Sequence, residues 1–138
     1  MRSVIAGRAV FDATVLVRSA LGASERAREW TEATETQALD AVAPDLIWLE
    51  TGNALAGYVR RGRLRLDQGR RALATLLRLP LRTIPAAELV EASFALALER
   101  RLSVYDACYA AIAEAEKAVL VTADRALAEA VAGSELIA

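Results

Sequence analysis

The sequence predicts an α/β fold with a parallel sheet flanked by helices. Short apolar and β-branched runs alternate with longer segments of helical periodicity, and this alternation is typical of parallel sheets. The 138 residues suffice for one compact domain with a sizeable core. A composition of 55% hydrophobic and 25% charged residues argues against disorder. Because no repeat, linker or low-complexity tract divides the sequence, we expect a single domain over residues 1–138.

The order of the elements follows from the pattern of apolar residues. Residues 1–7 are interpreted as a short lead-in. Strands are expected at the short apolar runs, residues 8–12, 39–43, 81–84, 118–122 and 135–137. Helices are expected at the longer segments, residues 15–21, 24–39, 44–61, 66–79, 86–100, 103–117 and 124–131.

Residues that start or stop helices mark the boundaries in the first half of the chain. Asp12 closes the first strand, and Gly22 breaks the short helix that follows it. Ser24 is a favourable N-cap for the second helix. Pro44 is expected to open the third helix as its first residue, and Gly62 to end it.

Similar signals mark the second half of the chain. Pro80 stops the helix that begins near Leu66, because proline cannot continue a helix. An alanine-rich segment predicts the helix over residues 86–100. Ser103 caps the next helix, and the β-prone run at residues 118–122 predicts the fourth strand.

The chain contains no histidine, which narrows the possible chemistry. Ser-His-Asp and Cys-His catalysis and histidine zinc sites are excluded. Any catalysis must use carboxylates, hydroxyls, Arg, Tyr or the single lysine, Lys117. Any metal site would consist of oxygen ligands, which suit Mg²⁺ or Mn²⁺. Cys108 is the only cysteine, so no intrachain disulfide can form.

Composition also bears on location and partners. No apolar run approaches the roughly 18 residues of a membrane span. Arg8 and Asp12 interrupt the apolar stretch near the N-terminus, which therefore fits a signal peptide poorly. We expect a cytoplasmic protein with no membrane partner. The net charge of −1 gives no overall attraction to nucleic acid, so such a partner would need a local basic patch.

Three acidic residues lie next to expected element boundaries, and each has an ordinary explanation beside a functional one. Asp12 ends a strand, where open α/β sheets bind their ligands, but it could also cap the following helix. Asp106 fits a capping box that starts at Ser103. Asp124 follows the fourth strand and could cap the last helix.

Glu50 has no such explanation, because it lies within a helix that is apolar almost all round. Burying an unpaired carboxylate is costly, so Glu50 needs a cation or a proton, and a paired arginine is the ordinary alternative. Asn53 lies three residues on, hence on the same helical face. A single site accounts for all four acids together. Clustered carboxylates raise each other's pKa, and divalent cations relieve that repulsion.

Four motifs in order resemble those of the PIN-domain family, and within it the VapC-type ribonuclease toxins. They read VFDAT ending at Thr14, PDLIWLETGNAL from Pro44, YDACYAAIA from Tyr105 and LVTAD ending at Asp124. Each motif alone is weak, but four with this order and spacing are strong, and the match spans nearly the whole chain. Asp12 lies somewhat further into the chain than is usual for these toxins.

The resemblance implies a PIN fold, with a central parallel sheet of about five strands flanked by helices. It also implies an endoribonuclease that depends on Mg²⁺ or Mn²⁺. The residues that carry over as catalytic acids and metal ligands are Asp12, Glu50, Asp106 and Asp124. Those expected to orient carboxylates or water are Thr14, Asn53 and Thr122. The metal would polarise the scissile phosphate and activate a water for in-line attack.

A second group of residues is basic and surrounds Gly62. It consists of Arg60, Arg61, Arg63, Arg65, Arg70 and Arg71, with only Asp67 among them. Such a patch can hold RNA phosphates, although a solvated cationic helix end is an equal alternative. Tyr58 could stack on a base or pack in the core, and Cys108 and Tyr109 are assigned to core packing.

The expected partners are an RNA substrate, a VapB-type antitoxin and a second copy of the chain. Apolar stripes on the helices at residues 24–39 and 66–79 could exceed what one small core needs. In the family that this sequence resembles, such helices take part in homodimerisation and in binding the antitoxin.

Three alternatives to a ribonuclease toxin compete with it. A catalytically silent PIN-like module that binds RNA or protein is disfavoured by the retention of all four acids. An aspartyl phosphotransferase would use Asp12 as nucleophile, but such enzymes usually need a second acid two residues on, where this chain has Thr14. A DNA flap nuclease is disfavoured by the small size of the chain.

Overall fold

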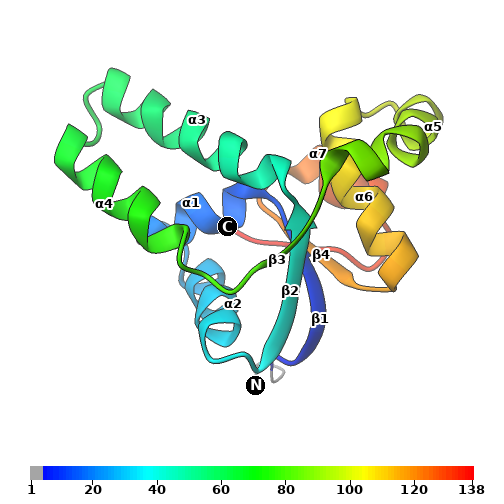
Figure 1. The fold of residues 1–138 in the computed structure, drawn as a ribbon, viewed down its shortest axis with the longest axis horizontal. Helices are drawn as coiled ribbons and strands as arrows, with labels where there is room; N and C mark the ends of the chain where they lie inside the picture. The colour runs from blue at the N-terminus through cyan, green and yellow to red at the C-terminus, as the bar shows by residue number, and fades with distance from the viewer. Residues whose placement is uncertain (1–4) are drawn as a thin grey trace.

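A five-stranded parallel sheet forms the centre of the molecule (Figure 1). The computed structural model describes residues 5–138, so residues 1–4 of the expected lead-in lie outside the described part. The strands are β1 (Gly7–Phe11), β2 (Leu39–Pro44), β3 (Arg82–Ile84), β4 (Val119–Thr122) and β5 (Glu135–Leu136). Every neighbouring pair is parallel, which confirms the predicted fold class.

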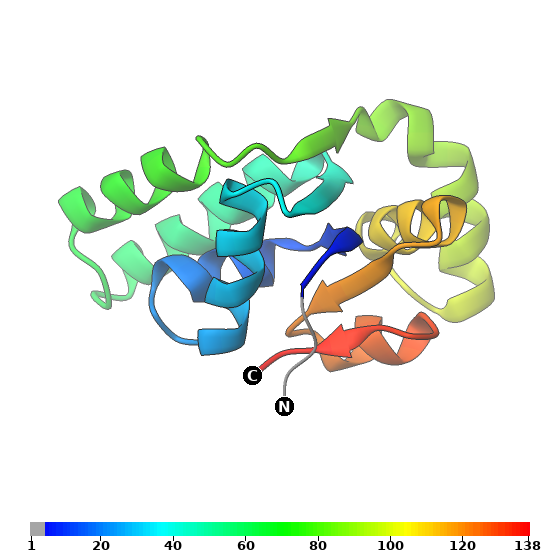
Figure 2. The same ribbon diagram turned by 90° about the horizontal axis from the view of Figure 1, so that it is seen from below.

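Helices lie on both sides of this sheet (Figures 1 and 2). They are α1 (Ala13–Ala20), α2 (Glu25–Glu35), α3 (Leu46–Arg60), α4 (Leu66–Leu76), the 3₁₀ turn η1 (Ala86–Leu89), α5 (Val90–Arg100), α6 (Val104–Glu116) and α7 (Arg125–Ala130). The hairpin of α3 and α4 extends to one side of the molecule, whereas α5, α6 and α7 lie on the other (Figure 1). No helix within residues 5–138 combines the length and the apolar character needed to cross a membrane.

The strand order, β3-β2-β1-β4-β5, places a topological switch point beside the central strand. From β1 the chain moves outward through β2 and β3, then returns to the other side of β1 to form β4 and β5. In open α/β sheets, ligands bind beyond the carboxyl ends of the strands at such a point. The ends of β1 and β4 are therefore where the fold favours a site.

The core forms around β1, whose last three residues are fully buried because helices cover both faces of the sheet. Phe11 packs edge-on against Trp30 of α2, with ring centroids 6.0 Å apart. Leu16 of α1, Ile47 of α3 and Leu120 of β4 are also fully buried. Each such side chain contributes roughly 1.5–3 kcal/mol on burial, so these contacts hold the end of β1 firmly.

The predicted start of the third helix is wrong, because Pro44 is the last residue of β2. The residue before a proline is restricted to extended backbone, which keeps the strand straight through Ala43. Asp45 then donates its backbone N–H to the carbonyl of Ile84, 2.9 Å away, and α3 begins at Leu46.

Three further helix boundaries differ from the sequence-based expectation. The second helix ends at Glu35, not near residue 39, because Gln37 adopts a left-handed backbone with φ 61°. The helix expected to reach residue 79 ends at Leu76. The segment 86–100 is not one helix: η1 precedes α5, and the Asp45 carboxylate accepts the Ala86 N–H at 2.9 Å.

A charge cluster ties the amino-terminal half of the sheet together. It consists of Arg8, Asp40, Arg82 and Glu116, from β1, β2, β3 and the end of α6. Arg82 bridges the two acids, at 3.1 Å from Asp40 and 2.6 Å from Glu116. Since three strands and a helix meet here, this cluster fixes their mutual positions away from the carboxyl ends of the strands.

Candidate active site

Asp12 lies at the carboxyl end of β1 and is 7% exposed. Its Oδ1 accepts hydrogen bonds from the backbone N–H and the hydroxyl of Thr14, at 3.1 and 2.5 Å. Its Oδ2 accepts from the hydroxyl of Thr122 at 2.5 Å. The parallel pairing of Phe11 with Val121 brings Thr122 beside Asp12. The carboxylate is therefore held at both oxygens and also caps α1.

The two threonine hydroxyls are themselves fixed by backbone donors. Thr14 Oγ1 accepts the N–H of Ala123 at 2.8 Å, and Thr122 Oγ1 accepts the N–H of Asp124 at 2.9 Å. Because each hydroxyl oxygen already accepts a hydrogen bond from a backbone N–H, each hydroxyl is oriented to donate its own proton in a hydrogen bond to Asp12. The network therefore orients Asp12 and links it to the β4–α7 turn that carries Asp124.

Glu50 is half-buried in the second turn of α3 and accepts a short hydrogen bond from the hydroxyl of Tyr109 on α6. Tyr109 is only 1% exposed, so the prediction that it packs in the core is right but incomplete. The ordinary alternative of an arginine partner for Glu50 does not occur among residues 5–138. A buried tyrosine hydroxyl usually finds a polar partner, but no local signal in the sequence identifies Glu50 as that partner.

Asp124 has the ordinary role that the sequence allowed, whereas Asp106 forms only the backbone half of the predicted capping box. The backbone N–H of Asp106 bonds to the hydroxyl of Ser103, which caps α6, at 3.0 Å. The Asp124 carboxylate caps α7 by accepting from the N–H groups of Ala126 and Leu127, at 3.0 and 3.3 Å. These contacts fix the positions of both residues at the starts of α6 and α7.

Mutual repulsion connects all four acids. Burial raises the pKa of Asp12 above its usual value despite its three hydrogen bonds, and Asp124 raises it further. Burial also raises the pKa of Glu50, to which Asp106 and Asp12 add. The pKa of Asp106 is raised by burial and then by Asp124. The structure thus brings the four predicted acids within electrostatic reach of one another.

No cation within residues 5–138 forms an ion pair with any of these acids. The same residues also contain no group of three or more His, Cys, Asp or Glu side chains arranged to hold a metal ion on its own. Mg²⁺ commonly binds through only one or two carboxylates, with waters and substrate phosphates completing its shell. An all-oxygen donor set with an uncompensated buried carboxylate fits that mode of binding.

Other predicted residues lie outside this network. Asn53 is exposed on α3 and makes no hydrogen bond to the acids among the described residues. Arg60, Arg61, Arg63 and Arg65 are exposed around the α3–α4 turn. They begin ten residues after Glu50, which is about 15 Å along the helix. They therefore flank the acidic site at a distance and do not enter it.

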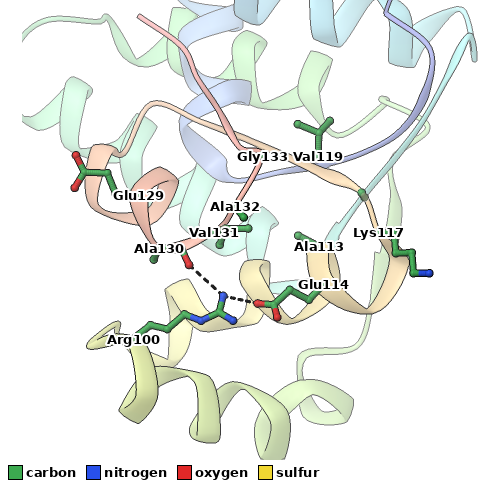
Figure 3. Close-up of a pocket in the computed structure, with 11 residues that line it drawn as sticks. Arg100, Ala113, Glu114, Lys117, Val119, Glu129, Ala130, Val131, Ala132 and Gly133 are labelled. Atoms are coloured by element: carbon green, nitrogen blue, oxygen red, sulfur yellow. Dashed lines mark hydrogen bonds and ion pairs between the residues drawn. The ribbon is translucent and has the colours of Figure 1, made fainter.

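A depression near the amino-terminal end of β4 contains none of the four acids (Figure 3). It has a volume of about 840 Å³ and lies where α6 ends and β4 begins. Arg100 extends across it, donates to the carbonyl of Ala130 at 3.1 Å and pairs with Glu114 (Figure 3). These contacts engage the Arg100 guanidinium, and none of the four candidate acids lines the depression.

The sequence matches one family model and resembles known proteins. The family model described as PIN domain matches residues 9–132. Ribonuclease VapC3 from Pyrobaculum aerophilum is 38% identical over 122 residues, which cover 87% of this chain and 92% of that protein.

Two solved structures resemble this one. PAE2754 from Pyrobaculum aerophilum aligns with a TM-score of 0.74 and 30% identity, covering 94% of this chain and 90% of that chain. VapBC2 from Rickettsia felis, determined with a DNA fragment from its promoter, aligns with a TM-score of 0.63 and covers 94% and 96% of the two chains. Its identity is 14%, so the latter likeness concerns the fold alone.

Proposed function

This chain belongs to the PIN-domain family, with a VapC ribonuclease among its relatives, and from that premise we propose that it is a metal-dependent endoribonuclease. It would hydrolyse phosphodiester bonds of RNA as the toxin of a VapBC-type toxin–antitoxin pair in the cytoplasm. The observation that carries the proposal is the convergence of Asp12, Glu50, Asp106 and Asp124 at the switch point of the sheet, with no cation among residues 5–138 paired to them.

Mg²⁺ or Mn²⁺ is the proposed cofactor. Asp12 and Asp106 would be its principal ligands, and Glu50 and Asp124 would act through water or at a second metal position. A divalent ion held there supplies positive charge to the scissile phosphate and makes a water a better nucleophile. The absence of histidine leaves carboxylates as the groups of this chain best suited to take up the proton of that water.

The chain's own residues prepare the site in three ways. Thr14 and Thr122 hold both oxygens of Asp12 and so fix its orientation. Tyr109 holds one oxygen of Glu50 and leaves Oε2 without a donor among residues 5–138, free to accept a proton. Asp106 is less buried than Asp12, which leaves one side of the site open to a polymeric substrate. The exposed arginines of the α3–α4 turn would contact RNA phosphates beyond the acids.

A catalytically silent module that binds RNA or protein is the second candidate. It is favoured by one observation, namely that no preassembled metal-binding group is present among the described residues. The two candidates differ in one expected result: in a silent module, substitution of the four acids by neutral residues would not affect function.

The test is cleavage of total cellular RNA by the purified protein in Mg²⁺, in Mn²⁺ and in EDTA. Asp12→Asn and Asp106→Asn keep the size of each side chain and should abolish metal-dependent cleavage. Glu32→Gln is the matched control, because Glu32 is exposed on α2 and pairs only loosely with Arg28 at 3.6 Å. Discrete fragments that vanish in the folded Asp variants support the proposal. Wild-type protein that binds the ion but cuts no RNA supports the silent module.

A second copy of the chain is a further proposed partner. Val90, Phe94 and Leu98 are spaced four apart on α5 and are 54%, 58% and 71% exposed. An uncovered apolar stripe of this kind commonly marks a protein interface. The sequence-based expectation placed the excess apolar surface on α2 and α4. The structure shows exposed Leu66 on α4 and Leu77 just beyond it, but no large exposed apolar residue on α2 among the described residues.

A further inference from the structure

A small pocket opens beside the acidic site, between α1 and α3. It has a volume of about 170 Å³ and is lined by Ala13, Thr14, Val17, Arg18, Ala54 and Tyr58. Thr14 is the residue whose hydroxyl holds Asp12. On α3, Glu50, Ala54 and Tyr58 are spaced four apart and therefore share one face of the helix. The pocket thus continues from the acidic site along both helices.

The walls of this pocket combine apolar, aromatic and cationic groups. Ala13, Val17 and Ala54 provide aliphatic surface, and Tyr58 provides a ring. The guanidinium of Arg61 lies 5.2 Å from the centroid of that ring. Arg18, in the last turn of α1, is partly buried and has no carboxylate partner among residues 5–138. Positive charge therefore flanks the pocket on the side away from the acids.

We propose that this pocket binds one nucleobase of the RNA substrate, from a nucleotide adjacent to the cleaved phosphate. The inference rests on the proposed ribonuclease function and adds a substrate subsite to it. The base would stack on Tyr58, while Arg18 and Arg61 contact the flanking phosphates. Proteins that read single-stranded RNA commonly splay bases onto aromatic rings and arginine planes in this way.

Size favours a single base over other occupants. The volume lies well below the roughly 300–1,000 Å³ typical of pockets for drug-sized ligands. A helix of a partner protein needs a long groove, whereas this pocket spans less than two turns of α1 and about one turn of α3. The cationic flank attracts the phosphates of RNA and repels a basic peptide.

The first test measures the affinity for a fluorescein-labelled random 12-nucleotide RNA by anisotropy in EDTA, where metal-dependent cleavage cannot proceed. Tyr58→Leu removes the stacking surface and should weaken binding about five- to tenfold, a typical loss for one stacked base. Tyr58→Phe keeps the ring and should bind within about twofold of wild type. Arg18→Gln should weaken binding and reduce its salt dependence, whereas Arg28→Gln on α2 should leave both unchanged.

A second test does not depend on variants, because Tyr58→Leu can lower stability. The same RNA with 5-iodouridine at each position in turn is irradiated with the wild-type protein, and the crosslinked residue is identified by mass spectrometry. We expect Tyr58 as the main crosslink. In cleavage assays with Mn²⁺, Tyr58→Leu should raise KM more than it lowers kcat, and it should broaden the choice of cleavage site.

The outcomes separate this subsite from the proposed function. Wild-type protein that neither binds nor cuts RNA overturns both. Normal cleavage by wild type, with Tyr58→Leu binding RNA as well as wild type does, overturns the subsite alone and assigns the pocket to another occupant, such as a protein segment. Crosslinks confined to residues outside the pocket have the same consequence.

Discussion

The hydroxyl of Tyr109 links two acids that lie far apart in sequence. Tyr109 follows Asp106 by three residues on α6, so one turn of this helix carries an acid and the donor that holds Glu50 of α3. Burial raises the pKa of Tyr109 well above its usual range, with the bond to Glu50 as a further cause. The hydroxyl is thus a neutral donor at any working pH, and its role is to position Glu50.

Tyr109→Phe removes this one hydroxyl and keeps the ring in the core. We expect roughly ten- to a hundredfold lower cleavage and weaker Mn²⁺ binding, as is typical when a residue that orients a metal-site carboxylate is lost. Calorimetric titration with Mn²⁺ measures metal binding independently of turnover. Tyr105→Phe is the matched control, because Tyr105 is 64% exposed on the same helix. Equal metal affinity in both variants would assign Tyr109 to packing alone.

Thr122 is fully buried, and its hydroxyl lies between the Asp124 N–H and the Asp12 carboxylate. Thr122→Val keeps the shape but leaves both groups without this partner, so we expect a loss of about 1–3 kcal/mol in the free energy of unfolding. Urea denaturation of the metal-free protein measures the loss. Thr34→Val is the control, because the Thr34 hydroxyl only donates to the Trp30 carbonyl of its own helix. A loss no larger than that of the control would argue against a special role for the network.

The sequence identified the acids but not the contacts that hold them. Asp12 and Asp124 stand next to element boundaries, so their capping roles could be predicted from local signals alone, as could the cap that Ser103 forms beside Asp106. The bond from Tyr109 to Glu50 joins residues 59 positions apart, and no local pattern distinguishes this tyrosine from one that only packs. The failure to place Asn53 has the same origin, because its exposure depends on what packs against α3.

At the level of elements, the alternation of strands and helices was predictable and several boundaries were not. Every expected strand forms, because each is a short apolar run that the sheet buries. Pro44 was misplaced because proline favours the first turn of a helix, whereas here it is the last residue of β2. The interruption between η1 and α5 depends on Asp45, 41 positions from its partner Ala86, and is invisible to local propensity.

The stability contributed by the charge cluster depends on pH. The cluster consists of Arg8, Asp40, Arg82 and Glu116 and joins three strands and a helix. Hydrogen bonds from Arg82 lower the pKa of Asp40 and of Glu116. The stability that the cluster contributes is therefore present above the ordinary pKa of these acids and is lost as pH falls through their lowered values. The cluster is partly exposed, so its contribution is at most about 1 kcal/mol.

Arg82→Gln should therefore lower the free energy of unfolding at pH 7 by less than about 1 kcal/mol, and the difference should shrink as the pH falls below roughly 4. Urea denaturation at low ionic strength, repeated between pH 3 and pH 7, provides the measurement. Arg28→Gln removes a single exposed pair with Glu32 and should have a smaller effect at every pH. A penalty for Arg82→Gln that stays constant down to pH 3 would show that packing, and not charge, carries the effect.

At the scale of the whole molecule, the acids and the charge cluster lie towards opposite ends of the strands. Asp12 and Asp124 lie at the carboxyl ends of β1 and β4, and the charge cluster ties the strands together nearer their other ends. On one side of the molecule lies the hairpin of α3 and α4 (Figure 1), whose turn carries the exposed arginines, and the small pocket lies between α3 and α1. On the other side, α5 presents its apolar stripe. A second copy docked on α5 would therefore leave the α3–α4 side of each site free for RNA.

This arrangement predicts how the homodimer can be broken without loss of the fold. Leu98 is 71% exposed, so Leu98→Glu should not disturb the core, but it places a charge within the proposed interface. We expect light scattering after gel filtration to give a dimeric mass for wild type and a monomeric mass for Leu98→Glu. Leu77→Glu, just beyond α4 and 52% exposed, should remain dimeric. If Leu77→Glu instead gives the monomer, the interface lies on the α4 side, where it would compete with RNA for the same surface.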